Sequence, residues 1–293
     1  PISRSTKPTC LYTLSASTRH VPRRLLLTHA GLGGWVSQKM REMGAEVVEG
    51  LGSWDAVGEI HSDVFLRDAR RREAEVLAAA AVAEAALGRE GVIFYAGGTT
   101  GAGLHASRGA PFNASVFLAK RLGAAVVAVD RHFPWGTWEL HLEHKFPLYL
   151  VYGGAEGPSR KYLAKRGHDV VAFPLPPGAG DRSFGKVLSY VLREVEGPLV
   201  LQLGFDIHRK DPTGYFFASE AFFYRLGEEL RGRQRFYISI ECPSTPAVFT
   251  ASLLALLSGL EGGGPPPVER YEESGDVLRE VDLLLRRARG RLS

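Results

Sequence analysis

The sequence predicts an α/β protein, a three-layer αβα sandwich around a mostly parallel sheet of eight strands. Short apolar runs rich in β-branched residues alternate with amphipathic helical stretches along most of the 293-residue chain. Strands that are apolar on both faces indicate a parallel sheet covered by helices on each side. Right-handed crossovers between such strands give three layers. Since no repeat or low-complexity linker interrupts the pattern, we expect residues 1–293 to form one domain.

The individual elements follow from hydrophobic periodicity. Continuous apolar runs predict strands at Arg24–Thr28, Ala45–Val48, Val92–Tyr95, Ala125–Asp130, Pro147–Tyr152, Val170–Phe173, Leu199–Leu203 and Phe236–Ile240. Amphipathic stretches between them predict helices at Trp35–Met43, Ser62–Leu87, Ala114–Leu122, Ser159–Arg166, Phe184–Val195, Ser219–Leu230, Ala247–Leu260 and Ser274–Arg289.

Composition argues against several classes of protein. The formal net charge is +4, but the basic residues are scattered, so nothing indicates a nucleic-acid partner. The only cysteines, Cys10 and Cys242, provide neither a disulfide scaffold nor a cysteine zinc cluster. Because no apolar run reaches membrane-spanning length and no secretory segment is evident, we expect a cytoplasmic protein. Asparagine occurs only at position 113, which favours a thermophilic source. The oligomeric state is not indicated.

Metal-binding side chains follow two of the predicted strands. Asp130 and His132 follow one apolar run, and Asp206 follows another. Ligands of open α/β sheets bind at the carboxyl ends of the strands. Two carboxylates and an imidazole are the donor set of a zinc site with an open position. The sequence therefore predicts Zn²⁺ at Asp130, His132 and Asp206. The alternative is that both aspartates cap helices and that His132 is an ordinary loop histidine.

Six segments occur in an order typical of one known family. They are Ile60–Leu66, Phe112-Asn113, Val127–His132 with Gly136-Thr137, Phe173–Asp181, Gln202–Asp206, and Glu241 with the helix after it. Together they resemble the histone deacetylase superfamily, with its acetylpolyamine amidohydrolases and acetoin-utilisation proteins, from about Val47 onward. The resemblance implies the arginase/deacetylase fold and the same three metal ligands. It also implies hydrolysis of an acyl-amide bond in a small molecule or acetylated amine, with a zinc ion polarising the carbonyl and activating water.

The catalytic accessories depart from the family pattern. The paired histidines of the family fall at Thr99 and Thr100, and the substrate-binding tyrosine falls at Ser244 in Glu241-Cys242-Pro243-Ser244, where the family has Glu-Gly-Gly-Tyr. The aspartate that orients a histidine falls at Ala128, which agrees with the loss of its partner because an unpaired buried carboxylate is costly. A threonine cannot replace imidazole as a general base, and losing such a base costs about a hundred- to ten-thousand-fold in rate.

Three functional hypotheses remain, of which the third is a purely structural relic whose surface engages a partner that the sequence does not identify. In the first, the protein is a zinc-dependent hydrolase of acyl-amide bonds, with Thr100 and Ser244 at the family's catalytic positions and His105 as a substitute base. In the second, it is a catalytically inactive deacetylase-fold protein that binds a metal or a small ligand in the former pocket. Cys242 is a candidate nucleophile or fourth metal ligand, although small buried thiols are commoner.

Two other features have a bland and a functional interpretation. The first is a group of histidines and glutamates, Glu139, His141, Glu143 and His144, within the predicted rim loop Phe133–Lys145. It suggests a second metal cluster, but an exposed loop is the interpretation we prefer. The second is the glycine-rich segment Gly97–Gly103, whose free amides could bind an anion. It lacks the lysine of a phosphate-binding P-loop.

Overall fold

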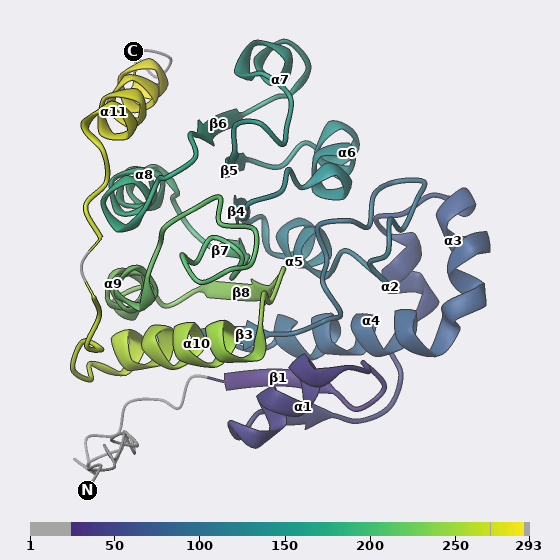
Figure 1. The fold of residues 1–293 in the computed structure, drawn as a ribbon. Helices are drawn as coiled ribbons and strands as arrows, with labels where there is room; N and C mark the ends of the chain where they lie inside the picture. Colours follow the sequence, from purple (N-terminus) through teal and green to yellow (C-terminus); the bar gives the residue numbers. More distant parts are fainter. Residues whose placement is uncertain (1–24, 270, 290–293) are drawn as a thin grey trace, which may run out of the picture.

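The computed structural model describes residues 25–269 and 271–289 and confirms the predicted fold class (Figure 1). Arg24 and Cys10, and with them the first part of the predicted single domain, lie outside the described residues. All eight strands join one sheet in the order β2-β1-β3-β8-β7-β4-β5-β6, and every pairing is parallel. The strands are β1 (Leu25–His29), β2 (Glu46–Val48), β3 (Val92–Phe94), β4 (Ala125–Val129), β5 (Leu148–Gly153), β6 (Val170–Leu175), β7 (Leu199–Leu203) and β8 (Phe236–Ile240).

Helices cover both faces of this sheet, and a separate hydrophobic core lies on each face. One layer contains α1 (Trp35–Glu42), α8 (Asp181–Glu194), α9 (Glu220–Arg231), α10 (Pro246–Glu261) and α11 (Gly275–Arg289). The other contains α2 (Trp54–Gly58), α3 (Asp63–Ala69), the 3₁₀ turn η1 (Arg70–Arg72), α4 (Glu73–Leu87), α5 (Ala114–Leu122), α6 (Trp135–His144) and α7 (Arg160–Arg166).

The central strands are buried along their whole length. Every residue of β4, β7 and β8 is buried, which is why these runs carry no polar alternation in the sequence. Burying each Val, Leu or Ile side chain contributes about 1.5–3 kcal/mol, so this three-strand centre is a rigid platform for whatever follows its carboxyl ends.

The predicted helix Ser62–Leu87 is wrong as a single element. It is divided into α3, η1 and α4, with the turn at Arg70–Arg72. None of these three arginines is buried, and the backbone of Arg72 at φ −126° and ψ 35° leaves the helical region and ends the continuous helix. The short helix α2, which begins with its N-cap Ser53 accepting from the Ala56 amide at 3.1 Å, was not predicted.

The rim loop predicted at Phe133–Lys145 is also wrong, because residues 135–144 form α6. His141 is buried and its Nδ1 lies 2.8 Å from the Phe146 carbonyl oxygen, while His144 Nε2 lies 3.0 Å from that of Ile60. Glu139 pairs with Arg108 at 2.8 Å. These side chains therefore anchor α6 in the fold. They form neither an exposed loop nor, among the described residues, a second metal cluster.

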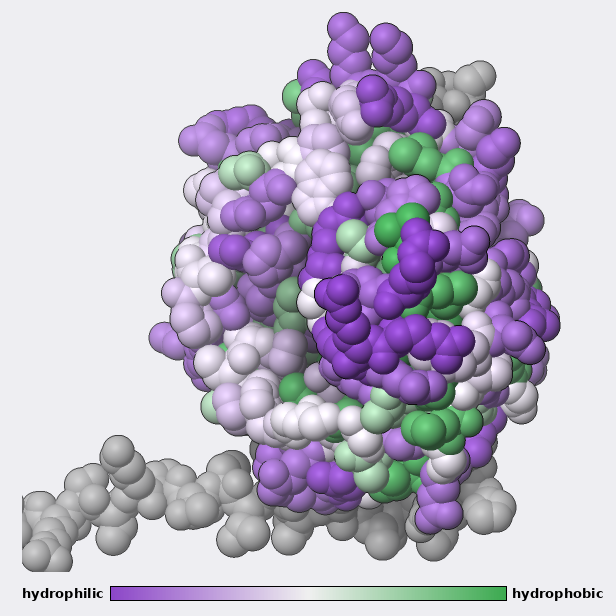
Figure 2. Space-filling view, turned by 90° about the vertical axis from the view of Figure 1, so that its right-hand side faces the viewer, coloured by the Kyte–Doolittle hydropathy of each residue, from purple (hydrophilic) through white to green (hydrophobic). Residues whose placement is uncertain are grey.

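None of the helices in residues 25–269 and 271–289 combines the length and the apolarity needed to cross a bilayer. On the face shown in Figure 2, hydrophobic residues occur in several separate groups among hydrophilic ones.

Candidate metal centre

The sheet brings two aspartates and a histidine together at one edge. Asp130 directly follows β4 and Asp206 follows β7, and these two strands are neighbours in register. The Gly204 amide extends the pairing by donating to the Val129 carbonyl at 2.7 Å. Since both strands are parallel, the side chains that follow them leave the sheet at the same end. The geometry predicted from strand order is thus present.

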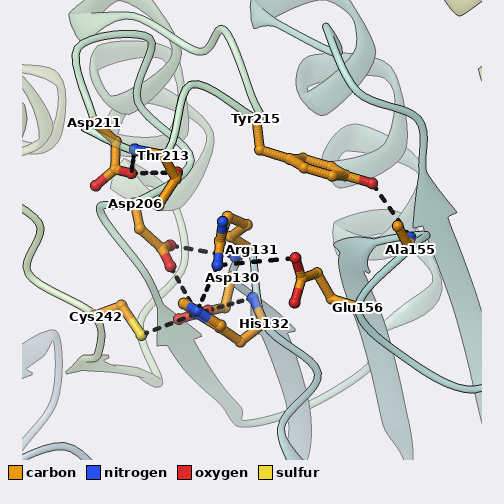
Figure 3. Close-up of polar contacts among 10 residues, drawn as sticks. All are labelled: Asp130, Arg131, His132, Ala155, Glu156, Asp206, Asp211, Thr213, Tyr215 and Cys242. Carbon is orange, nitrogen blue, oxygen red and sulfur yellow. Dashed lines mark hydrogen bonds and ion pairs between the residues drawn. The ribbon is translucent and has the colours of Figure 1, made fainter.

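The contacts within this group are short (Figure 3). His132 Nδ1 lies 3.1 Å from Asp130 Oδ1 and 2.9 Å from Asp206 Oδ2. The backbone amides of His132 and Arg131 donate to Asp130 Oδ1 at 2.8 Å and to Asp206 Oδ1 at 3.2 Å. On its outer side, His132 Nε2 lies 3.0 Å from the Arg131 guanidinium. One imidazole nitrogen therefore points between two carboxylates.

The two buried carboxylates are incompletely satisfied by their neighbours in the described part of the chain. Asp130 and Asp206 are only 2% and 4% exposed. Among the described residues, Asp130 Oδ2 has no hydrogen-bond partner, and Asp206 Oδ2 has only its contact with His132. Buried carboxylate oxygens without donors are costly unless a proton or a cation accompanies them. The pair thus resembles a cation site.

Gly204 is the residue that lets the two aspartates approach. A Cβ built there would overlap Asp130 Oδ2 and would lie 2.7 Å from Asp206 Oδ1. The backbone of Gly204 is not in the left-handed region, so the requirement for glycine arises from space rather than from φ. Sequence reasoning did not single out this position.

The electrostatics of the group favour an added positive charge. Burial, and then the neighbouring Asp206 carboxylate, raise the pKa of Asp130 to about 7. Hydrogen bonds to Asp130 and then Asp206 raise the pKa of His132 to about 10. An acid that resists ionisation beside a base that resists deprotonation indicates a surplus of negative potential.

Cys242 joins the group from the end of β8. Its Sγ lies 3.6 Å from His132 Nδ1 (Figure 3). The ligand atoms of Asp130, His132, Asp206 and Cys242 all lie within 4.8 Å of one another. Burial, followed by the two carboxylates, raises the pKa of the Cys242 thiol. Carboxylate oxygen, imidazole nitrogen and sulfur are all accepted by tetrahedral divalent metals, so the residues present fit such an ion.

The two threonines at the positions of the family's paired histidines serve another residue. Glu241 accepts from the Thr99 amide at 2.7 Å, the Thr99 hydroxyl at 2.6 Å and the Thr100 amide at 3.3 Å. The loop amides predicted to bind an anion therefore do contact a carboxylate, but it belongs to this chain. Burial raises the pKa of Glu241.

His105 and Ser244 lie in contacts of their own. His105 is exposed, and its Nδ1 lies 2.8 Å from the Ser62 hydroxyl. The Ser244 hydroxyl donates to Asp211, and Ser244 adopts the left-handed backbone conformation at φ 61°. Neither residue belongs to the group of potential metal ligands.

A buried polar network beneath the site was not predicted. Gln202, opposite Ala128 in the β4–β7 register, donates to the hydroxyls of Thr99 at 3.1 Å and Thr137 at 2.9 Å. The side-chain amide nitrogen of Asn113, Nδ2, also donates to the Thr137 hydroxyl, at 3.2 Å. The only sequence signal was that polar residues interrupt otherwise apolar runs.

His61 is a second buried histidine whose role sequence reasoning missed. Its Nδ1 lies 2.7 Å from the Gly103 carbonyl oxygen, and its Nε2 accepts from the backbone amide of Asn113 at 3.3 Å. The ring stacks on Phe65 with a centroid distance of 3.8 Å. This histidine locks the glycine-rich loop to the start of α5.

Comparisons with known proteins agree with these observations. The chain is 30% identical over 129 residues to an acetylpolyamine amidohydrolase of Burkholderia pseudomallei (strain 1710b), a match that covers 39% of this chain and 37% of that relative. The match thus spans less than two fifths of the relative's length. The fold is similar to that of the HD domain of HDA15, with a TM-score of 0.67 and 15% identity over 83% of this chain and 82% of that one. No family model matches the chain. The chain therefore shares its fold with the HD domain of HDA15 and is similar over part of its sequence to an acetylpolyamine amidohydrolase.

Proposed function

We propose that this protein is a zinc-binding member of the histone deacetylase superfamily that does not use the deacetylase route of catalysis. The observation that carries the proposal is the convergence of Asp130, His132 and Asp206, with Asp130 Oδ2 buried and without a hydrogen-bond partner among the described residues. Zinc suits the mixture of oxygen and nitrogen donors better than magnesium or calcium, which prefer oxygen alone.

The residues at the family's catalytic positions are committed to other contacts. Thr99 and Thr100 bind Glu241, and Ser244 binds Asp211. His105 contacts Ser62. A bound zinc ion supplies Lewis acidity toward a carbonyl oxygen. Proton transfer to and from the reacting atoms still requires a positioned base, and the side chains of Thr99, Ser244 and His105 are engaged in the contacts just described.

A second candidate function is hydrolysis of an acyl-amide bond on a small amine. It is favoured by the local identity to a protein described as an acetylpolyamine amidohydrolase. Under this hypothesis, the substrate is an acetylated polyamine or a similar acetylated amine. The reaction would rely on the ion and on the shape of the pocket, because the usual acid–base residues are replaced.

Metal analysis and a turnover assay on the same sample separate these candidates. We expect about one zinc ion per chain in the wild type and none in Asp206→Asn, with Glu229→Gln on the surface as the matched control. We expect no hydrolysis of acetylputrescine or acetyl-lysine peptide by the zinc-loaded protein. Turnover that disappears in Asp206→Asn would establish the hydrolase instead. Absence of zinc at saturating concentration would contradict both candidates.

A further inference from the structure

We infer that Cys242 is the fourth protein ligand of the metal centre and closes it to water and substrate. The inference rests on the zinc site proposed above and adds a ligand to it. The superfamily pattern has glycine at this position of the turn, so the thiol is a property of this chain. The structure places this thiol beside the three proposed metal ligands.

The backbone holds Cys242 firmly beside the other ligands. Beyond Ile240, the chain continues alongside the extension of β7, since the Glu241 amide donates to the Leu203 carbonyl at 2.9 Å. The Phe205 amide then donates to the Cys242 carbonyl at 2.8 Å. These bonds fix the cysteine next to the segment that carries Asp206. Figure 3 shows its sulfur directed toward His132.

The donor spacing matches that of a tetrahedral zinc site. Zinc–sulfur bonds of about 2.3 Å and zinc–nitrogen bonds of about 2.0–2.1 Å at tetrahedral angles place sulfur and nitrogen about 3.6 Å apart. Cys242 Sγ and His132 Nδ1 are 3.6 Å apart. The two carboxylate–imidazole distances, 3.1 and 2.9 Å, are a few tenths below the about 3.4 Å that the same geometry requires.

An independent observation indicates that something binds among these atoms. Asp130 is only 2% exposed, and its Oδ2 has no hydrogen-bond partner among the residues that the structure describes. The Cys242 thiol also interacts with the Asp130 carboxylate, which places the sulfur beside this second ligand as well. A cation shared by the two carboxylates, the imidazole and the sulfur satisfies every one of these donors.

Four protein ligands change what the centre can do. Structural zinc sites are closed by four residues, whereas catalytic sites keep one position for water or substrate. With Cys242 bound as thiolate, its proton having passed to solvent, no such position remains. This agrees with the engagement of the Thr99 hydroxyl and the Thr100 amide by Glu241 and of the Ser244 hydroxyl by Asp211. The centre is then a stabilising ion site at the carboxyl edge of the sheet.

Cobalt substitution tests the sulfur ligand directly. The metal-free full-length chain is titrated with Co²⁺, and a thiolate-to-cobalt charge-transfer band is sought in the near ultraviolet, together with strong tetrahedral bands in the visible. We expect the charge-transfer band in the wild type and in the matched control Cys10→Ser, and its loss in Cys242→Ser. Competition with a chelator should show a zinc affinity at least roughly tenfold weaker for Cys242→Ser than for the wild type. Loss of a residue that only hydrogen-bonds a metal ligand already lowers metal affinity by about this factor.

The outcomes distinguish this inference from the proposal beneath it. If Co²⁺ binds at one per chain but the wild type lacks the charge-transfer band, or Cys242→Ser retains it, the fourth ligand is wrong and the three-ligand zinc site stands. If no metal binds to the wild type, both fail. If Cys242→Ser is poorly folded, Cys242→Gly, which restores the superfamily residue, replaces it with the same expected loss of the band.

Discussion

The Thr99 hydroxyl donates to Glu241 Oε1 at 2.6 Å, although 142 positions separate the two residues in the chain. Glu241 is 2% exposed, and the Ser239 hydroxyl also donates to it at 2.7 Å. With the Thr99 and Thr100 amides, four donors therefore surround one buried carboxylate. This carboxylate ties the loop after β3 to the end of β8.

Glu241→Gln should destabilise the protein by about 2–4 kcal/mol. The amide nitrogen of glutamine would face N–H and O–H donors, and each buried donor left unpaired costs about 1–3 kcal/mol. Urea unfolding measures the change. Glu261→Gln, at the exposed end of α10, is the matched control and should stay within about 0.5 kcal/mol of the wild type. Equal midpoints for the two variants would show that the carboxylate does not hold the loop.

The fold could be predicted from the sequence because its signals are local. Each of the eight apolar runs became a strand, since continuous burial on both faces leaves a continuous apolar sequence. Helix α6 could not be predicted because Gly136 and Thr137 are poor helix formers. Its start is fixed by tertiary contacts, among them the Gly136 amide donating to the Thr100 carbonyl at 2.9 Å. A Cβ at Gly136 would lie 2.5 Å from the backbone of Gly101.

The candidate site also combines residues whose positions follow from local sequence patterns with residues whose positions depend on tertiary contacts. Asp130, His132 and Asp206 could be predicted to meet because strand ends of a parallel sheet share one edge. The spacing of Cys242 depends on how β8 and β7 are paired, which no local pattern gives. The partners of Glu241 and His61 are also distant in sequence, so their roles emerge only from the packed structure.

Gly204→Ala should weaken zinc binding by more than about tenfold with a smaller effect on folding. The added methyl group would push Asp130 and Asp206 apart, because its carbon would lie 2.7 Å from Asp206 Oδ1 and even closer to Asp130. Displacing ligands of a metal typically costs at least this factor in affinity. Gly185→Ala in α8, where the new carbon meets nothing within 4 Å, is the control and should bind zinc like the wild type. Unchanged affinity in Gly204→Ala would mean that the ion is held elsewhere.

Because His61 is buried, we expect the protein to lose stability in mild acid. Burial lowers the pKa of His61 to about 4, below its ordinary value of 6.5. Between these values the unfolded chain binds more protons than the folded one, so the free energy of unfolding rises with pH over this interval. The contribution is complete above about pH 6.5 and is lost as the pH falls toward 4, an effect of about 3 kcal/mol.

The measurement is urea unfolding at a series of pH values between 4 and 7, for the wild type and His61→Gln. The variant should be less stable at pH 7, because the contacts with Gly103 and Asn113 are weakened. Its curve should be flatter by up to about 3 kcal/mol across the interval. Parallel curves would show that other groups cause the acid sensitivity.

Ala128→Asp should be among the most damaging single changes in the sheet. Ala128 is 1% exposed in the centre of β4, and its register partners are Leu150 and Gln202. In the superfamily pattern an aspartate at this position supports a histidine, but this chain has Thr99 and Thr100 there, already bound to Glu241. The new carboxylate would be buried without a partner, which costs about 3–5 kcal/mol.

Ala164→Asp on the exposed side of α7 is the matched control, and its cost should not exceed about 0.7 kcal/mol, the difference in helix propensity. If Ala128→Asp proved as mild as this control, the interior beneath the metal centre would already be equipped to stabilise a carboxylate. The presence of threonines in place of the family's histidines would then no longer explain why this chain has alanine at position 128. A large loss confined to Ala128→Asp would indicate that threonine, alanine and glutamine here form one co-adapted interior.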